Sequence, residues 1–332
     1  MLEQEIYDFV TKYKLIENGD RLVLGVSGGP DSICMLDILY KISKKINFEI
    51  VTCHINHGLR ENAIKDEEFV KNFCENIRVE CFIKHSNVKK IAQSQKLGLE
   101  ETGRIVRYEF FNEILEKTNS NKIAIAHNSN DRVETIIMNL LRGTGTRGII
   151  GIEKMNGKYI RPLIEITRGE IEQYLKENNI TARHDESNDD NIYTRNKIRN
   201  IVIPYIEKEF NPNIIETFKR LSDISAEQES YLEKQTQRIY QQLCIEEKIE
   251  KGNLEIKINL KEFNKQDVFI QKRLILYAIS KIFGSSKGIE KVHIDDIIKL
   301  CNNNIGNKFL TPNKFTKIVI KKKQLTIMAV NV

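Results

Sequence analysis

The chain has 332 residues, which is long enough for two domains with separate hydrophobic cores. Hydrophobic residues make up 40% of the sequence and charged residues 30%, with only 5 prolines, and this balance excludes long disordered or collagen-like segments. Lys and Arg outnumber Asp and Glu by 52 to 46, so the formal net charge of +6 permits a polyanionic partner without requiring one.

The N-terminal stretch MLEQEIYDFVTKYK has the pattern of an amphipathic helix and lacks the apolar segment of a signal peptide. No apolar run approaches the roughly 20 residues that span a bilayer. We therefore expect a cytoplasmic protein without membrane contacts. The six cysteines form no CxxC pair, so we expect reduced, mostly buried thiols rather than a disulfide framework or a zinc ribbon.

Short apolar segments alternate with helical stretches through the first two thirds of the chain. The predicted strands are residues 21–26, 48–55, 79–85 and 122–127, and helical patterns follow at 33–45, 67–76 and 131–142. This alternation predicts an α/β fold with a doubly wound, mainly parallel sheet that is covered on both faces. In such sheets, ligands bind beyond the carboxyl ends of the strands.

The pattern changes near residue 211, where apolar residues begin to recur at helical spacing over roughly eight turns. We expect one domain in residues 1–210 and a smaller, helical α+β domain in residues 211–332. The second domain is predicted to contain a strand at 254–260, helices at 268–283 and 289–301, and a hairpin at 315–328. The sequence leaves open whether a homodimer forms through this domain.

The C-terminal end is strongly basic, because residues 307–332 include six lysines and no acidic residue. Such a segment suits a surface that contacts phosphates, and it equally suits a solvated strand edge.

A glycine-rich segment, SGGPDS, directly follows the first predicted strand and opens a helix. Backbone N–H groups at such a turn can hold a phosphate. A Walker A loop has a lysine before its final Ser or Thr, but Asp31 stands there in this sequence, so the segment is not a kinase-type or GTPase-type loop. An acidic residue beside bound phosphates indicates a Mg²⁺ ion between them. The six nucleotide-binding candidates are Ser27, Gly28, Gly29, Pro30, Asp31 and Ser32.

This segment resembles the SGGxDS loop of the ATP pyrophosphatase, or PP-loop, superfamily, whose members cut ATP between its α and β phosphates. Six further segments resemble the tRNA(Ile)-lysidine synthetase family, in the family's order, over roughly residues 20–205. They are HINHGLR from residue 54, GRIVRY from 103, HNSNDRVET from 127, RPL from 161, and DESN with YTRNKIR from 185 and 193.

The sequence departs from the family pattern at two positions. The family usually has two aspartates where this chain has Asn130 and Asp131, which puts a role for the first position in doubt. It usually has proline where this chain has Glu186. Many members also carry a third, C-terminal domain that helps to hold tRNA. This chain ends before such a domain, as expected of a short-form member or a trimmed chain.

The resemblance implies a two-step reaction that uses ATP and Mg²⁺. The wobble cytidine of a tRNA(Ile) with a CAU anticodon is first adenylated, which releases pyrophosphate. Free L-lysine then displaces AMP through its side-chain amine, and the product base is lysidine. The implied partners are therefore this tRNA and L-lysine.

The resemblance also implies roles for four catalytic candidates. Asp31 would hold Mg²⁺, while Asp131 and Glu134, which share one face of a helix, would grip and deprotonate the lysine amine, whose free pKa is roughly 10.4. Acidic residues also favour any first helical turn, so the pair would equally suit an ordinary surface helix. Arg107 would bind the adenylate phosphate or the substrate carboxylate, although Arg104 and Arg107 would also suit a solvated helix face.

Histidine and arginine side chains complete the predicted site. His54 and His57 are expected near the nucleotide or in packing of their loop, and we consider a metal site less favoured because no Cys or carboxylate has suitable spacing. Single-stranded loops are read by side chains that contact the backbone and the base edges. The tRNA-binding candidates are Arg142, Arg147, Asn188, Arg195 and Arg199.

Three alternative functions stay open at this stage. A tRNA thiolase would use the same loop, but such enzymes commonly need CxxC pairs or a paired catalytic cysteine. An amidotransferase partner that makes GMP or NAD fits the YTRNKIR segment and the basic C-terminal end poorly. A non-catalytic tRNA-binding module would not need the intact loop with Asp131 and Glu134.

Overall fold

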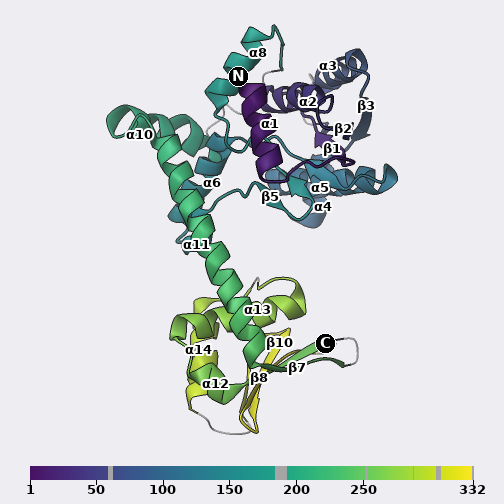
Figure 1. Cartoon of the computed structure of the whole chain (residues 1–332). Coiled ribbons are helices and arrows are strands. Elements are labelled where there is room, and N and C mark those ends of the chain that lie inside the picture. Colours follow the sequence, from purple (N-terminus) through teal and green to yellow (C-terminus); the bar gives the residue numbers. More distant parts are fainter. Residues whose placement is uncertain (59–62, 184–192, 251–252, 287, 304–307, 331–332) are drawn as a thin grey trace. The chain divides into compact units, whose positions relative to one another are not determined.

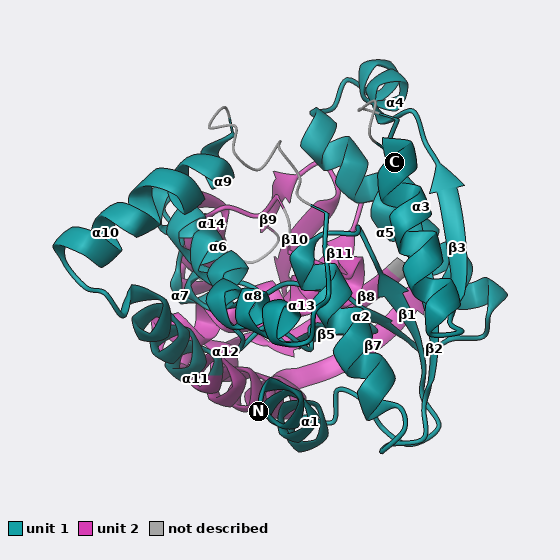
Figure 2. Cartoon of the chain, turned by 90° about the horizontal axis from the view of Figure 1, so that it is seen from above, with its two compact units in different colours: residues 1–226 teal, residues 227–332 magenta. Residues whose placement is uncertain are grey.

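The computed structural model describes residues 1–332 except 59–62, 184–192, 251–252, 287, 304–307 and 331–332 (Figure 1). The chain divides into two compact units, Met1–Ala226 and Glu227–Val332 (Figure 2). Among the described residues, no helix combines the length and the apolar character needed to cross a membrane.

The first unit is built on a six-stranded sheet with the strand order β3-β2-β1-β4-β6-β5. Neighbouring strands are parallel except for the antiparallel β5–β6 pair, which confirms the predicted doubly wound, mainly parallel sheet. Strands β5 and β6 were not predicted, because two-residue strands show no alternation. The strands are β1 (Arg21–Gly25), β2 (Glu49–Asn56), β3 (Glu80–His85), β4 (Lys122–Ala124), β5 (Met155–Asn156) and β6 (Tyr159–Ile160).

Helices cover both faces of this sheet because the buried strand β1 is apolar on both sides. Leu22 and Leu24 enter one core with side chains of α1, α2, α3 and α8, whereas Val23 enters a second core beneath α5. All three side chains are fully buried, and each contributes roughly 1.5–3 kcal/mol to folding. The helices are α1 (Leu2–Lys12), α2 (Pro30–Ile42), α3 (Ala63–Asn76), α4 (Val88–Gln95), α5 (Leu99–Lys117) and α8 (Arg168–Glu177).

The six cysteines are all free, as the sequence predicted. Four of them, Cys34, Cys53, Cys74 and Cys301, are buried. They contribute to the cores as small apolar side chains.

A second helical layer lies at the carboxyl ends of the strands and carries the polar motifs. Apolar side chains of η2 and α10, Ile198 and Ile203, form a small core with Val133 and Ile137 of α6. This packing holds α9 and η2 against α6. The elements are α6 (Ser129–Leu141), α7 (Thr146–Ile149), α9 (Thr194–Lys197), the π-helical turn η2 (Ile198–Val202) and α10 (Ile203–Glu209).

The division between the two units falls inside a long helix, α11 (Ile214–Leu243), and not near residue 211 as expected from the sequence. The first part of α11 binds the first unit. Ser222 Oγ donates to the carbonyl of Ile150 at 2.6 Å, and the buried Arg132 pairs with Asp223 at 2.7 Å. These contacts explain why the division lies at Ala226–Glu227, further along the chain.

The second unit contains an antiparallel sheet with the order β7-β8-β11-β10-β9. Ile256, Ile258, Ile318 and Ile327 of the sheet form a core with α12, α13 and α14. The unit is thus α+β, with strands β7 and β9 in addition to the predicted ones. Its elements are β7 (Cys244–Glu250), β8 (Asn253–Asn259), α12 (Leu260–Asn264), α13 (Val268–Phe283), α14 (Lys291–Asn302), β9 (Lys308–Asn313), β10 (Thr316–Lys321) and β11 (Gln324–Ala329).

Candidate active site

The SGGPDS segment forms a tight loop between β1 and α2 at the carboxyl end of the central strand. Ser32 Oγ accepts hydrogen bonds from the backbone N–H groups of Ser27 and Gly28, both at 3.2 Å, and donates to the carbonyl of Gly29 at 2.9 Å. Gly29 is the N-cap of α2 and Pro30 is its first residue, so the positive end of the helix dipole points at the loop. The loop therefore has the local geometry that holds a phosphate group.

Glycine is required at position 28 of this loop. Its φ of +92° lies in the region that L side chains rarely adopt. A Cβ atom at this position would also lie 3.3 Å from the side chain of Val70 on α3. The close approach of α3 and the unusual backbone together fix the path of the loop.

Asp31, in the first turn of α2, is the most unusual carboxylate of this region. Its Oδ1 atom is buried without a hydrogen-bond partner. Burial, and then the charge of Asp131, raise the pKa of Asp31 to about 6. A buried, unsatisfied carboxylate oxygen beside a second carboxylate is the environment that a divalent cation would relieve.

The site suits Mg²⁺, because this ion needs few ligands from the protein. The described residues contain no group of three or more His, Cys, Asp or Glu side chains that could hold a metal ion by themselves. Mg²⁺ commonly binds through one or two carboxylates, with water and substrate phosphates completing its shell. Asp31 would supply the protein ligand beside the phosphate loop.

The N-terminus of α6 carries the second predicted acidic pair. Asn128 Oδ1 accepts the N–H of Asp131 at 3.0 Å, and Asp131 Oδ2 accepts the N–H of Asn128 at 3.1 Å, so the two residues form a capping box. Asp131 and Glu134 are both buried, with exposed fractions of 7% and 0%. The sequence allowed an ordinary surface helix here, but buried charges of this kind need partners.

Those partners are two arginines from α9 and η2. Arg195 donates to Glu134 Oε2 at 2.7 Å and to Asp131 Oδ1 at 2.9 Å, and Arg199 donates to the same Asp131 oxygen at 2.9 Å and also pairs with Glu134. Burial alone would raise the pKa of Asp131, but the charges of Arg195 and Arg199 outweigh this effect and lower it. The four side chains, Asp131, Glu134, Arg195 and Arg199, are called the acid–arginine cluster below.

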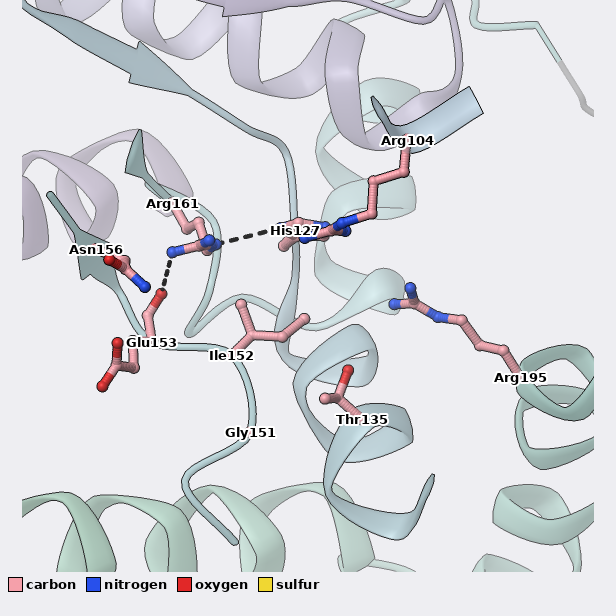
Figure 3. A pocket seen from close by; sticks show the side chains of 9 residues that line it. All are labelled: Arg104, His127, Thr135, Gly151, Ile152, Glu153, Asn156, Arg161 and Arg195. Carbon is pink, nitrogen blue, oxygen red and sulfur yellow. Dashed lines mark hydrogen bonds between the residues drawn. The ribbon is translucent and has the colours of Figure 1, made fainter. Parts of the chain in front are cut away.

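A pocket of about 350 Å³ opens beside this cluster (Figure 3). Three guanidinium groups, of Arg104, Arg161 and Arg195, enter it from different elements, and Thr135 reaches it from α6. Its nine lining residues are Arg104, His127, Thr135, Gly151, Ile152, Glu153, Asn156, Arg161 and Arg195.

His127 lies in this pocket as a neutral ring. Burial lowers its pKa to about 4. Its Nδ1 atom lies 3.3 Å from Nε of Arg161, which can only donate, so Nδ1 accepts and the ring proton is on Nε2. Arg161 also donates to the carbonyl of Glu153 at 2.7 Å and is itself buried. The pocket thus presents N–H donors that are fixed by buried contacts.

Comparison with known proteins agrees with this geometry. The PP-loop domain family matches residues 1–206. The chain is 40% identical over 328 residues to tRNA(Ile)-lysidine synthase of Caldanaerobacter subterraneus subsp. tengcongensis, an alignment that covers 97% of this chain and 69% of the relative. It is 43% identical over 311 residues to the enzyme of the same name from Clostridium acetobutylicum, covering 93% and 66%. The chain belongs to the tRNA(Ile)-lysidine synthase family.

The chain spans about two thirds of the length of these tRNA(Ile)-lysidine synthases. Among solved structures, the fold is similar to that of the U34-tRNA thiolase NcsA from Methanococcus maripaludis, with a TM-score of 0.57 and 19% identity over 67% of this chain and 77% of that one. At this identity the likeness concerns the fold alone.

The two predicted histidines take different positions. His54 is buried, and its Nδ1 lies 2.9 Å from the carbonyl of Val26, directly before the phosphate loop. It therefore supports the strand end beneath the loop. His57 lies near the start of α5, where a Cβ atom on Gly103 would be 4.0 Å from its ring.

The predicted arginines also lie in different places. Arg107 is exposed to solvent and does not line the pocket, although nearby protein atoms desolvate its guanidinium group and lower its pKa. Arg142 and Arg147 are exposed beyond the C-terminal end of α6 and do not line the pocket. Asn188 lies outside the described residues.

The sequence analysis missed two members of the site, His127 and Arg161. Both stand in segments that carried the family resemblance, HNSNDRVET and RPL, but neither residue was given a role. The signal that could have found them is position, because each residue directly follows the end of a parallel strand or its short extension.

Proposed function

We propose that this protein ligates L-lysine to the wobble cytidine of a tRNA(Ile) with a CAU anticodon, with ATP as the activating substrate. The observation that carries the proposal is the arrangement at one edge of the sheet. A phosphate loop follows β1, and a buried acidic pair follows the neighbouring strand β4, next to an open pocket. The name of the similar relatives, tRNA(Ile)-lysidine synthase, supports tRNA(Ile) and lysine as the substrates.

The first step is adenylation of the cytidine by ATP. The loop N–H groups and the N-terminus of α2 would stabilise the negative charge of the leaving pyrophosphate. A bound Mg²⁺ would supply further positive charge there. Asp31 is the residue that would hold it, because its buried Oδ1 atom has no other partner.

The second step requires an uncharged lysine amine. Asp131 and Glu134 would bind the incoming ammonium, and their ion pairs with Arg195 and Arg199 support this role. If the ammonium replaces Arg195, Asp131 and Glu134 would hold it by the same kind of ion pair and would accept its proton as the amine attacks the cytidine and displaces AMP.

Arg195 and Arg199 would gain a second task in this exchange. A guanidinium released from Asp131 and Glu134 can turn to a phosphate or a base edge of the anticodon loop. This exchange reconciles the predicted tRNA contacts with the ion pairs of the free protein. It also requires that lysine and tRNA both bind the acid–arginine cluster.

The second unit would contact the phosphate backbone of the tRNA. Lys321 and Lys322 line a hollow of about 310 Å³ on its sheet, together with Lys257, which is paired with Glu255 of the same lining at 3.3 Å. Lysines on an accessible sheet face suit phosphate contacts, whose strength falls steeply with salt. This part of the proposal predicts salt-sensitive tRNA binding.

The test is incorporation of radiolabelled L-lysine into an unmodified transcript of this tRNA, with and without ATP and Mg²⁺. A transcript whose wobble cytidine is replaced by uridine is the matched control. We expect label only with ATP, Mg²⁺ and the cytidine transcript. Release of pyrophosphate without labelled tRNA would instead support the adenylation step and contradict lysine as the second substrate.

A PP-loop tRNA thiolase is the closest rival. Its sulfur chemistry commonly requires paired cysteines, and the six cysteines of this chain include no CxxC pair. None of them lines the pocket beside the acid–arginine cluster. A non-catalytic tRNA-binding module would show neither lysine label nor pyrophosphate release in the same assay.

A further inference from the structure

Two neighbouring cysteines, Cys74 and Cys81, have no role in the reaction proposed above. Cys74 lies near the C-terminal end of α3, and Cys81 is the second residue of β3. Both thiols are free, and both side chains belong to the core that α2 and α3 form with the sheet. A hydrogen bond joins the two thiols. The two sulfur atoms are thus already in contact.

The strand register explains how the two thiols meet. Thr52 of β2 and Cys81 of β3 are paired residues of neighbouring parallel strands, so their side chains point to the same face of the sheet. The Sγ atom of Cys74 lies 3.3 Å from Oγ1 of the same threonine. Both cysteines therefore adjoin one side chain, Cys74 from the helix that covers the sheet and Cys81 from the next strand.

The chain between the two cysteines is short and tightly turned. Helix α3 ends at Asn76, and strand β3 begins at Glu80. The N–H of Val79 donates to the carbonyl of Cys74 at 3.0 Å, and Arg78 has a φ of +57°, in the left-handed region that commonly ends helices. A bond between the two sulfur atoms would therefore close a small loop that the backbone has already formed.

The two thiols differ in exposure and in acidity. Cys74 is buried, whereas Cys81 is half-buried on β3, the edge strand of the sheet. The hydrogen bond between them lowers the pKa of the Cys81 thiol and raises the pKa of the Cys74 thiol. The thiolate is the form that reacts with peroxides, and the reaction also requires access. Cys81 is therefore the thiol that reacts first.

Helix α3 connects this pair of thiols to the phosphate loop. Val70, one turn before Cys74, is the side chain that a Cβ atom at Gly28 would meet at 3.3 Å. In the first turn of α3, Asp66 accepts from Nε of Arg183 at 2.8 Å, and the N–H of Arg183 donates to the carbonyl of Gly28 at 2.9 Å. A shift of α3 would therefore reach the loop by two routes.

We propose that Cys81 is a site of oxidation by hydroperoxides and that Cys74 converts the product into a disulfide that slows the use of ATP. With hydrogen peroxide, the Cys81 sulfur attacks one oxygen, the O–O bond breaks, and water leaves as Cys81 becomes a sulfenic acid. The Cys74 sulfur then attacks the Cys81 sulfur, the S–O bond breaks, and a second water leaves. Two thiols are oxidised and one peroxide is reduced, with both thiol hydrogens ending in water.

The disulfide would pull on the C-terminal end of α3. Bonded sulfur atoms lie about 2.05 Å apart, much closer than two hydrogen-bonded thiols. Closing this distance draws Cys74 toward β3, and Val70 and Asp66 belong to the same helix. Both routes from α3 to the phosphate loop would shift, and a displacement of about 1 Å is enough to slow a reaction strongly. The effect on ATP use rests on the proposed function, whereas the disulfide itself does not.

The experiment treats the reduced protein with hydrogen peroxide and maps its disulfides by mass spectrometry of peptides. Pyrophosphate release with tRNA and ATP is measured on the reduced protein, on the oxidised protein and after dithiothreitol has been added back. The variants are Cys81→Ser and Cys74→Ser. Cys244→Ser is the matched control, because Cys244 is also half-buried but lies in the second unit, where its Sγ is 3.6 Å from the hydroxyl of Tyr240.

In the wild type we expect a disulfide between Cys74 and Cys81 and pyrophosphate release that is slower by about tenfold or more. Dithiothreitol should reverse both changes, a result that needs no variant. Neither change should occur in Cys81→Ser. Cys74→Ser should instead accumulate a sulfenic acid at Cys81, which dimedone labels, because the second thiol is missing. Cys244→Ser should behave as the wild type does.

Several results would overturn the proposal. A disulfide between other cysteines, or dimedone label on Cys74 rather than on Cys81, would contradict the order of the two steps. Equal sensitivity of Cys81→Ser and the wild type to peroxide would place the oxidised group elsewhere. A disulfide between Cys74 and Cys81 with an unchanged rate of pyrophosphate release would reject the link to the phosphate loop. If the reduced wild type releases no pyrophosphate, the proposed function fails, and the peptide map still decides whether the disulfide forms.

Discussion

The two ends of the central strands carry buried charges of very different character. At the amino end, Asp20 accepts hydrogen bonds from Lys122 at 2.8 Å, from Asn121 at 2.6 Å and from the N–H of Glu17 at 2.7 Å. At the carboxyl end, Asp31 has a buried oxygen without a partner and lies near Asp131. Asp20 precedes strand β1 and Asp31 follows it, so a difference between the two carboxylates reflects the residues that surround each one.

The pKa shifts of the two carboxylates have opposite signs. Burial alone would raise the pKa of Asp20, but the hydrogen bonds from Lys122 and Asn121 outweigh it and lower the pKa. Burial and the charge of Asp131 raise the pKa of Asp31 to about 6. The ion pair and hydrogen bonds of Asp20 are thus complete within the protein, whereas Asp31 has the unsatisfied oxygen that we propose a ligand completes. Perturbed carboxylates of this second kind are typical of functional sites.

The largest effect is expected for Asp31→Asn. Loss of the Mg²⁺ ligand should reduce ATP-dependent pyrophosphate release by about a hundredfold or more. The free energy of unfolding should rise by about 2–3 kcal/mol at pH 7, because the folded-state pKa lies above the unfolded one and the ionised form is disfavoured in the folded protein.

That gain in stability should appear above about pH 6 and vanish near pH 4, where the carboxylate is protonated in both states. Urea titrations at several pH values, without ATP or Mg²⁺, would measure it. An unchanged rate of pyrophosphate release would contradict the role given to Asp31.

The next largest effect concerns the acid–arginine cluster. Asp131→Asn should slow lysine transfer by about tenfold to a thousandfold, because the amine loses both an ionic partner and a proton acceptor. ATP binding and adenylation should largely be spared, so adenylated tRNA should accumulate. Gel separation of labelled tRNA would detect it. Loss of adenylation with normal capture of lysine by a chemically adenylated tRNA would contradict the assignment.

A smaller effect on stability, and little on chemistry, is expected at the amino end. Asp20→Asn should lower the free energy of unfolding by about 1–3 kcal/mol at pH 7, since the half-buried Lys122 loses its nearer carboxylate and keeps the more distant Glu17 at 3.7 Å. The folded-state pKa of Asp20 is lowered, so its contribution is present above the unfolded pKa, about 4, and is lost as the pH falls further. The difference from the wild type should therefore shrink in acid. A difference that is constant with pH would indicate a steric cause.

The smallest effect is expected for Asn130→Asp, which restores the residue that the family usually has. Asn130 Oδ1 accepts the N–H of Arg168 at 3.0 Å, and an aspartate oxygen can accept the same hydrogen bond. We expect lysine transfer within about twofold of the wild type, since the contact positions α8 rather than the substrates. A change of tenfold in the KM for lysine would place residue 130 in the binding site.

The sequence predicted the parts of the fold that depend on local patterns. The strand before Ser27, the helix after it and helix α13 (Val268–Phe283) follow from apolar periodicity and from the glycine-rich turn. The two-residue strands β5 and β6 and the edge strands β7 and β9 were missed, because their pairing is decided by neighbouring strands and not by their own residues.

The sequence named the four residues of the acid–arginine cluster but not the contacts between its acids and its arginines, and it gave no role to His127 or Arg161. It placed Asp131 and Glu134 together on one helix face for lysine, and assigned Arg195 and Arg199 to tRNA. Arg195 is 64 positions from Asp131, so no local pattern could show that the two are hydrogen-bonded. The pairing follows from the packing of Ile198 against α6, which is a property of the folded core.

The most direct measurement is a comparison of Asp20→Asn and Asp31→Asn in which the free energy of unfolding and the rate of lysine transfer are determined on the same preparations. The account predicts opposite outcomes: Asp20→Asn should lose stability and retain its rate of transfer per folded molecule, and Asp31→Asn should gain stability and lose transfer. A parallel loss of both quantities in both variants would contradict the separation between a structural end and a ligand-binding end of the strands.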